Sequence, residues 1–323
     1  MANTKMHFHN LYPDTPLELR DVLRWKLGLG PKEVPPVILP ETREALAVAA
    51  GLAKKRTAEL TEVPAAERVR LTWIGHATFL LQHYGRNILT DPIFGDCQPV
   101  PIGRLRRALP PGIALRDMPR IDDVVISHSH YDHLDKPAIK ALGAGVHYWV
   151  PMGLGEWFRK RGMERCTEMG WWQSAELGGG ITLHSVPAQH SSGRTGRDRD
   201  ETLWCGWVLK SATRTVYFAG DTGYSPVFRE IGARFGGVDL AILPIGAYQP
   251  RWLMKVVHMN PAEAVQAHLD VEARTSVGCH FGTFRLADEP LEEPPALLAQ
   301  ELAARQIDPQ RFLALANGES IDI

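Results

Sequence analysis

The feature that most constrains this chain is a string of metal-binding side chains, His128-Ser129-His130-Tyr131-Asp132-His133, which directly follows the apolar run Val124-Val125-Ile126. Imidazole and carboxylate groups are the ligands that zinc and similar first-row ions prefer. A merely solvated polar loop would not explain four such groups within six residues. The string therefore predicts a metal site at the end of a strand, and four ligands on one tight loop can serve two neighbouring ions.

Three further candidate ligands each follow an apolar run later in the chain. His190 follows residues 186–189, Asp221 follows 216–220 and His280 follows 275–279. Loops at strand ends hold side chains rigidly while their polar groups stay open to substrate. An aspartate can also bridge two ions. We therefore expect His128, His130 and His190 on one ion, Asp132, His133 and His280 on the other, and Asp221 between them.

Composition excludes several classes of protein. Apolar residues make up 44% and charged residues 23% of 323, which is typical of a globular chain, and the net charge of −1 gives no global attraction to nucleic acid. No apolar run reaches the roughly 18 residues of a membrane span, and the first residues lack the apolar core of a signal peptide. The four cysteines form no C-x-x-C pair and are expected to be buried free thiols. We expect a cytoplasmic protein that binds no nucleic acid.

The first 66 residues differ in texture from the rest of the chain. Helical spacing at Pro16 to Leu27 and at Glu41 to Lys55 flanks a proline-rich stretch. We expect residues 1–66 to form a helical extension packed on the core, and residues 67–323 to form one hydrolase domain. The first of these helices is amphipathic, so contact with a membrane surface is the alternative to packing.

From residue 68 onward short β-type runs alternate with helices. The first three runs predict an antiparallel meander, and Asn260, Pro261 and Glu263 have the spacing of a helix cap. The mixture indicates two sheets flanked by helices. The expected strands are 69–74, 78–81, 88–90, 123–126, 145–150, 181–186, 203–209, 215–219, 240–243 and 312–315, and the expected helices are 137–142, 260–269 and 295–306.

These residues resemble the metallo-β-lactamase superfamily and, within it, the phospholipases D that hydrolyse N-acyl-phosphatidylethanolamine, with their bacterial relatives. The order of the H-x-H-x-D-H string, a later His, Gly220-Asp221-Thr222 and a last His matches along the chain. The resemblance covers nearly the whole chain. It implies an α/β fold of the α+β kind, a four-layer αββα sandwich with a two-metal site between its sheets. The other matching segments are 71–78, 89–94, 187–190, 202–204, 218–224, 258–264 and 280–284.

The resemblance implies a zinc-dependent phosphodiesterase. It would release N-acylethanolamine and phosphatidate by attack of a hydroxide that bridges two Zn²⁺ ions, and Fe or Mn would also fit one position. Asp132 and Asp221 would orient the hydroxide. His258, just before the Asn260 cap in a matching segment, would protonate the leaving group or contact the phosphate. His76 and Asp91 match positions that brace the metal loop rather than bind the ions.

Two other functions stay open: a metallohydrolase of a smaller soluble phosphodiester or lactone, and a metal-binding protein without turnover. A lactamase is disfavoured because Asp221 supplies a carboxylate that the β-lactam-cleaving branches lack. A nuclease is disfavoured because Asp221 and His280 are only 59 positions apart (280 − 221), which leaves no room for a clamp domain.

The expected partners are a phospholipid or small phosphodiester substrate, with peripheral contact to the inner face of a membrane and homo-oligomer formation left open. Basic stretches at 104–107 and at Arg194, Arg197 and Arg199 are candidates to meet an anionic head group. Leu105, Ile113 and Trp157 are among the candidates to line an acyl groove. The remaining histidines are expected to be structural: His7, His9, His83, His147, His184 and His268.

Overall fold

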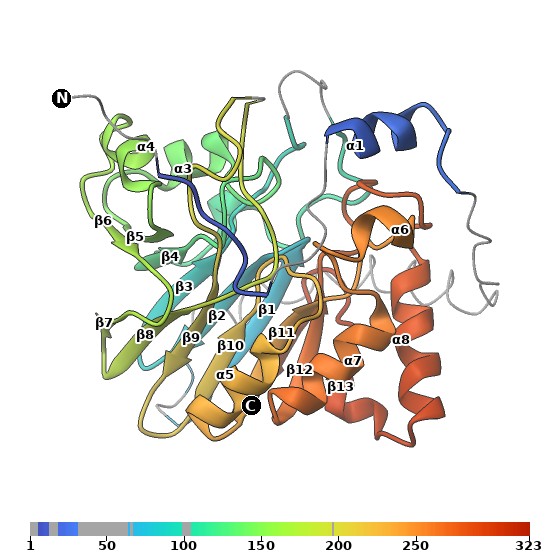
Figure 1. Cartoon of the computed structure of the whole chain (residues 1–323). Coiled ribbons are helices and arrows are strands. Elements are labelled where there is room, and N and C mark those ends of the chain that lie inside the picture. Colours follow the sequence, from blue (N-terminus) through green and yellow to red (C-terminus); the bar gives the residue numbers. More distant parts are fainter. Residues whose placement is uncertain (1–5, 13–18, 32–63, 65–66, 99–104, 196) are drawn as a thin grey trace.

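Two mixed sheets of seven strands each form the centre of the molecule (Figure 1). The computed structural model describes residues 6–12, 19–31, 64, 67–98, 105–195 and 197–323. The first sheet has the order β14-β1-β2-β3-β4-β5-β6. Its strands are β1 (Arg70–Gly75), β2 (Thr78–His83), β3 (Arg86–Thr90), β4 (Asp123–Val125), β5 (His147–Pro151), β6 (Cys166–Met169) and β14 (Ser320–Asp322).

The second sheet repeats the same plan, with the order β13-β12-β11-β10-β9-β8-β7. In each sheet three neighbouring pairs are antiparallel and the other three are parallel. Its strands are β7 (Ser174–Gly178), β8 (Ile181–Val186), β9 (Gly206–Lys210), β10 (Thr215–Phe218), β11 (Val238–Pro244), β12 (Ala273–Cys279) and β13 (Phe312–Leu313).

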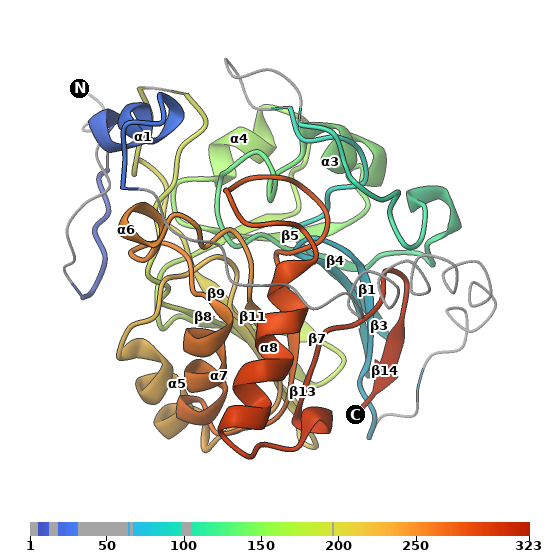
Figure 2. The same cartoon turned by 90° about the vertical axis from the view of Figure 1, so that its right-hand side faces the viewer.

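Helices cover the outer faces of both sheets, which makes the four-layer αββα arrangement that the resemblance implied (Figures 1 and 2). The first sheet carries α3 (Lys136–Leu142) and α4 (Gly155–Arg159). The second carries α5 (Val227–Phe235), α7 (Pro261–Asp270) and α8 (Glu293–Ala304). In both views α1 (Leu19–Lys26) and α6 (Arg251–Met254) lie at the same end of the molecule as α3 and α4. None of the described helices is long and apolar enough to cross a membrane.

Side chains of the first sheet alternate between two apolar clusters. On β2, Phe79 and Leu81 join the large cluster that also contains the side chains of the second sheet, whereas Leu80 joins the cluster beneath α3 and α4. On β4, Val125 and Val124 divide in the same way. Successive side chains of a strand point to opposite faces, so a strand covered on both faces is apolar throughout. The loops at the strand ends therefore start from rigid, fully buried supports.

Most of the expected elements are present with small shifts. The meander of β1, β2 and β3 is antiparallel as predicted, and Asn260 and Glu263 form the predicted capping box at the start of α7. The predicted strand at 203–209 begins only at Gly206, and the last predicted strand stops at Leu313. Helix α5 and the short strands β6, β7 and β14 were not predicted from the sequence. The helix expected at 41–55 lies outside the described residues, and the boundary at residue 66 stays a prediction.

The described cysteines are all free thiols. Cys97, Cys205 and Cys279 are buried as expected, but Cys166 is only partly buried because it begins β6 near the edge of the first sheet.

One buried histidine outside the candidate site makes stability depend on pH. His268 on α7 is fully buried, and its Nδ1 lies 2.7 Å from the Ser276 hydroxyl of β12. Burial, assisted by the charge of Arg311, lowers the pKa of His268 to about 4. As the pH falls below the unfolded pKa of 6.5 the unfolded chain takes up the proton first, so stability is lost between pH 6.5 and 4.

We therefore expect the free-energy advantage of the wild type over His268→Asn to shrink by about 2 kcal/mol between pH 7 and pH 5. The measurement is urea unfolding of both proteins in chelator at the two pH values. A difference between the two proteins that does not change with pH would contradict the assignment.

Candidate metal centre

The loops that leave the strands bring all seven predicted ligands together. The loop after β4 carries His128, His130, Asp132 and His133, while His190 follows β8. In the first group the ring nitrogens of three histidines converge. His130 Nδ1 lies 2.8 Å from His128 Nε2 and 3.2 Å from His190 Nε2. Such a group offers three ligand atoms to a single ion.

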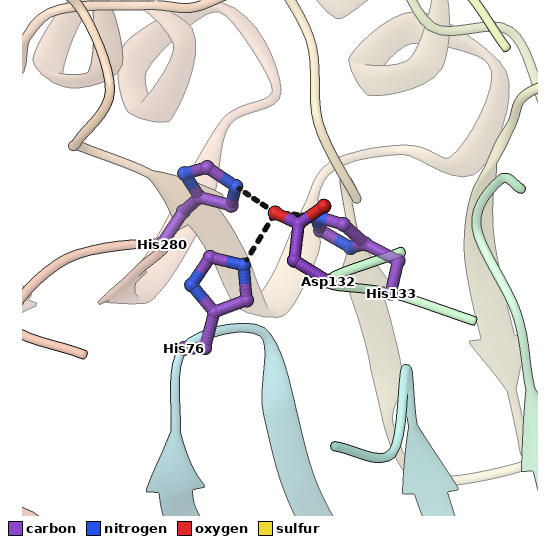
Figure 3. Close-up of side chains that lie close together, drawn as sticks. All are labelled: His76, Asp132, His133 and His280. Carbon is purple, nitrogen blue, oxygen red and sulfur yellow. Dashed lines mark hydrogen bonds and ion pairs between the residues drawn. The ribbon is translucent and has the colours of Figure 1, made fainter. Parts of the chain in front are cut away.

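A second group surrounds the Asp132 carboxylate (Figure 3). Its Oδ2 lies 2.9 Å from His76 Nε2, 3.4 Å from His133 Nε2 and 3.4 Å from His280 Nε2. His76 occupies the turn between β1 and β2, and His280 directly follows β12. The structure thus places His76 as close to this group as the predicted ligands, a position that the sequence interpreted only as bracing.

Asp221, which follows the end of β10, stands between the two groups. Its Oδ2 lies 3.1 Å from His133 Nε2 and 3.0 Å from His280 Nε2 in the second group. The same oxygen is 4.0 Å from His128 Nε2 and 3.9 Å from His190 Nε2 in the first group. One carboxylate therefore faces both predicted ion positions, which is the geometry expected of a bridging ligand.

The electrostatics of the cluster show that it is built around positive charge. Burial opposes ionisation of Asp132 and Asp221, yet the neighbouring histidines, His133 foremost, hold the pKa of both carboxyls well below their usual range. Burial likewise opposes protonation of His133 and His280, but Asp221 and Asp132 raise the pKa of His133 well above its usual value and that of His280 to about 9. The two carboxylates therefore favour positive charge on this side of the cluster.

The first group has the opposite character. Burial, followed by the neighbouring histidines, lowers the pKa of His128 well below its usual value, and burial lowers that of His130 and His190 as well. Neutral rings keep the lone pair that a metal ion needs.

The donor set fits divalent ions. His133 Nε2, His280 Nε2, His258 Nδ1 and Asp221 Oδ1 are buried without a hydrogen bond in the described part of the chain. Buried polar atoms are almost always paired, and unpaired ones indicate a missing ion or a functional role. Imidazole and carboxylate groups in this mixture suit zinc, and iron or manganese as well.

Asp91 braces the loop that carries the string. It is fully buried, accepts a 2.7 Å hydrogen bond from the Ser127 amide, and its Oδ2 lies 2.7 Å from His133 Nδ1. That contact turns His133 Nε2 toward Asp221. A glycine is required nearby, since a Cβ on Gly220 would lie 2.5 Å from that of Ser127. The close approach of the two loops sets the position of Asp221.

Backbone strain is concentrated at the cluster. His76, Asp91 and His280 all have positive φ angles, of 57°, 33° and 62°. Such conformations cost about 1–3 kcal/mol each in residues other than glycine, and they persist where surrounding packing enforces them. The fold therefore holds these side chains in orientations that a relaxed loop would not adopt.

His258 also lies at the cluster, in the segment between α6 and α7. Its Nδ1 is 3.9 Å from Asp221 Oδ2, and it forms a third group of ligand atoms with His190 and Asp221. Burial lowers the pKa of His258 to about 3. Its side chain is nevertheless 13% exposed, unlike those of His190 and Asp221 at 3% each, so it lies on the open side of the cluster.

A cavity of about 570 Å³ adjoins the metal-loop residue Tyr131. Lys136, Lys140 and Arg161 line it together with the aromatic rings of Tyr131 and Trp157. Six of its nine lining residues lie on or beside α3 and α4. The cavity is therefore a basic and partly aromatic hollow on the same loop as the candidate ligands.

The predicted head-group arginines divide into two kinds. Arg194 lines the cavity, but its Nη1 also donates to the carbonyls of Ser129 and Leu134, so it clamps the metal loop. Arg199 instead pairs with Asp200. The prediction that Arg107 meets an anionic head group is wrong. Its guanidinium turns inward and donates to the carbonyls of Ile93 and Leu109.

The candidate acyl groove is also revised by the structure. Ile113 is buried in the cluster beneath α3 and α4, and Leu105 packs on a small cluster around Ile93. Neither side chain lines the cavity, because both fill apolar space in the core, whereas Trp157 does line it.

Comparison with known proteins shows related sequences and folds. A protein family described as a beta-lactamase superfamily domain matches residues 86–281. The chain is 40% identical to N-acyl-phosphatidylethanolamine-hydrolyzing phospholipase D 1 of Caenorhabditis elegans, over 77% of this chain and 74% of that one. It is 35% identical to the mitochondrial N-acyl-phosphatidylethanolamine-hydrolyzing phospholipase D of Saccharomyces cerevisiae, over 69% of this chain and about half (49%) of that one.

The fold also resembles Igni18, a metallo hydrolase from the archaeon Ignicoccus hospitalis, with a TM-score of 0.62 and 21% identity over 79% of this chain and 98% of that one. At this level of identity the likeness shows the fold alone.

Removal of the Asp91 carboxylate should weaken metal binding without unfolding the protein. Asp91→Asn leaves one acceptor oxygen where the Ser127 amide and His133 Nδ1 use two. Loss of such a partner costs about 10- to 100-fold in metal affinity. The measurement is competition for Zn²⁺ with a chromophoric chelator. Asp117→Asn, at an exposed carboxylate, is the matched control. Equal affinity in wild type and Asp91→Asn would show that His133 needs no such support.

Proposed function

Since the chain belongs to the beta-lactamase superfamily and has the fold of its metal-dependent hydrolases, we propose that it is a dinuclear zinc phosphodiesterase of the phospholipase D type. Its substrate would be N-acyl-phosphatidylethanolamine, and its products N-acylethanolamine and phosphatidate. The observation that carries the proposal is the position of Asp221 Oδ2 between two groups of ligand atoms. The 40% identity to a named phospholipase D of this kind supports the substrate.

Seven residues would hold the ions. Two bound cations supply a water molecule with a pKa lowered to about 7 and neutralise charge on a phosphoryl group. One group would be His128, His130 and His190, the other Asp132, His133 and His280, with Asp221 shared between them.

The surrounding residues would orient the substrate and its nucleophile. Asp132 keeps its carboxylate fixed because His76 Nε2 donates to it at 2.9 Å, so its free lone pairs have one defined direction. His258 Nδ1 makes no hydrogen bond within the described residues, and the side chain lies on the open side of the cluster. We assign it the role of contacting the phosphate or the leaving oxygen, the two roles that the sequence left open.

The basic cavity is the proposed place for the polar head of the substrate. Lys136, Lys140 and Arg161 contribute positive charge, and Asp135 is the opposing carboxylate in its lining. The net positive charge of this lining favours an anionic group near the metal loop. Charges of one sign in a concave site concentrate the electric field and attract ligands of opposite charge. Trp157 and Tyr131 would contact the apolar parts of the lipid.

The decisive assay is mass spectrometry of products after incubation of the zinc-loaded protein with N-acyl-phosphatidylethanolamine in detergent. We expect metal-dependent release of N-acylethanolamine together with phosphatidate. Asp132→Asn should lower the rate at least about 100-fold, because it removes a carboxylate from both the ion site and the orienting network. Metal content is measured on the same samples.

Other outcomes of this assay separate the alternatives. Two bound metals with no lipid cleavage would sink the lipid assignment and direct the search to soluble phosphodiesters and lactones. Two bound metals without turnover of any of these substrates would favour a metal-binding protein. Release that persists after complete removal of metal would contradict the mechanism.

We also propose peripheral membrane contact through α1. Within the described residues, five of the six exposed large apolar side chains lie between residues 6 and 29. Leu23, Leu27 and Leu29 are 53%, 70% and 64% exposed. Trp25 on the same helix donates a 2.8 Å hydrogen bond from Nε1 to Asp288, which holds the helix on the body of the protein. Arg24 and Lys26 add positive charge in the last turn, so an anionic lipid surface fits this helix.

The contact predicts a loss of vesicle binding in a triple variant, Leu23→Ser, Leu27→Ser and Leu29→Ser. We expect binding to vesicles of phosphatidylglycerol and phosphatidylcholine to fall at least tenfold in a sedimentation assay, since about 2 kcal/mol or more of apolar burial is lost. Leu269→Ser removes an exposed leucine far from this segment in the sequence, 39% exposed on α7, and should bind normally. Equal binding by all three proteins would place the contact elsewhere.

A further inference from the structure

The described residues 6–12 contact the loop that carries His190, although they lie about 180 positions away in the sequence. This segment precedes residues 86–281, which match the superfamily domain. Three of its residues make hydrogen bonds to the stretch between Gln189 and Trp204. We name residues 8–12 the N-terminal strap.

Asn10 makes the central contact of the strap. Its Oδ1 accepts a 3.1 Å hydrogen bond from the His190 backbone amide. The same oxygen accepts a 2.9 Å hydrogen bond from Trp204 Nε1, whose side chain is almost completely buried. One side-chain oxygen therefore links the backbone of a candidate metal ligand to a fixed aromatic ring of the core.

The ring of His190 has an anchor of its own. Its Nδ1 lies 2.9 Å from the carbonyl oxygen of Val257, which leaves Nε2 to face His130 and Asp221. A ring nitrogen fixed to a carbonyl sets the direction of the other nitrogen only if the backbone of the residue is fixed as well. The Asn10 contact supplies that second constraint.

Two flanking contacts hold the strap itself in place. The Phe8 amide donates 2.9 Å to the carbonyl of Asp200, and the Tyr12 carbonyl accepts a 2.7 Å bond from Gln189 Nε2. The Tyr12 ring packs against the large apolar cluster, and its hydroxyl bonds Glu230 at the start of α5. Asn10 is thus held from both sides, as a positioning group must be.

We propose that Asn10 is a positioning residue of the metal centre, and that the N-terminal strap sets the place of His190. The inference rests on the proposed function, because His190 is a proposed ligand. Asn10 touches neither ion nor substrate in this account. It acts through the backbone of His190, so the strap completes a site whose ligands all come from the sandwich.

The test compares Asn10→Ala, which removes the acceptor, with Asn10→Asp, which keeps it. Leu11→Ala changes an exposed neighbour on the same strap and is the control. Two properties are measured: the Zn²⁺ affinity at each ion position by chelator competition, and the amide hydrogen exchange of residues 189–204 in the metal-free protein.

Zn²⁺ binds in two steps, one for each ion position. We expect Asn10→Ala to lower the Zn²⁺ affinity of one step, that of the His190 group, by about 10- to 100-fold and to leave the affinity of the other step unchanged. Exchange across 189–204 should quicken at least about tenfold, since an opening equilibrium follows the lost bond. Asn10→Asp should restore both properties, and Leu11→Ala should change neither.

A terminal segment that only packs on the surface would give a different result. It would lower the unfolding temperature of Asn10→Ala while zinc affinity and the exchange of 189–204 stay at wild-type values, and that result would overturn the inference. If the wild type binds no zinc, the proposed site fails. The exchange of residues 189–204 then still decides whether Asn10 positions His190.

Discussion

The arrangement of the candidate site depends on the buried carboxylate of Asp221. Asp221 is almost fully inside the protein, yet five histidine rings approach its Oδ2 within 4.0 Å. A carboxylate in such a place is tolerated only when positive charge surrounds it. His133 and His280 contribute to this charge, because the carboxylates of Asp221 and Asp132 raise the pKa of both rings. In the candidate site, the negative charge of a buried carboxylate is therefore balanced by the positive charge that the fold places around it.

The two sheets make this balance geometrically feasible. Each sheet sends loops from its strand ends toward the same edge, so residues separated by more than 200 positions, such as His76 and His280, come within 4.1 Å between ring centres. Positive φ angles at both residues, and the close approach of Gly220 to Ser127, show that packing overrules local preference there. Strain at the edge is sustained by the apolar strands behind it.

The sequence predicted the meander, the Asn260 cap and the seven clustered residues from local patterns. Edge strands such as β7 escaped prediction because their alternation of buried and exposed residues is weak. The inward turn of Arg107 could not be read either, since a basic residue on a loop reveals nothing about the carbonyls that will meet it. The proximity of His76 to Asp132 depends on a turn in the left-handed region, which no spacing rule anticipates.

By itself, the sequence determined which chemistry is available: the ligand types, their order along the chain and the strands that carry them, because these follow from side-chain identity and hydrophobic period. Only the tertiary structure decided the contact of His76 with Asp132, the place of His258 on the open side and the contact of Asn10 with His190. Distances between remote segments depend on how sheets and helices pack. That packing is a property of the whole chain, and no single motif contains it.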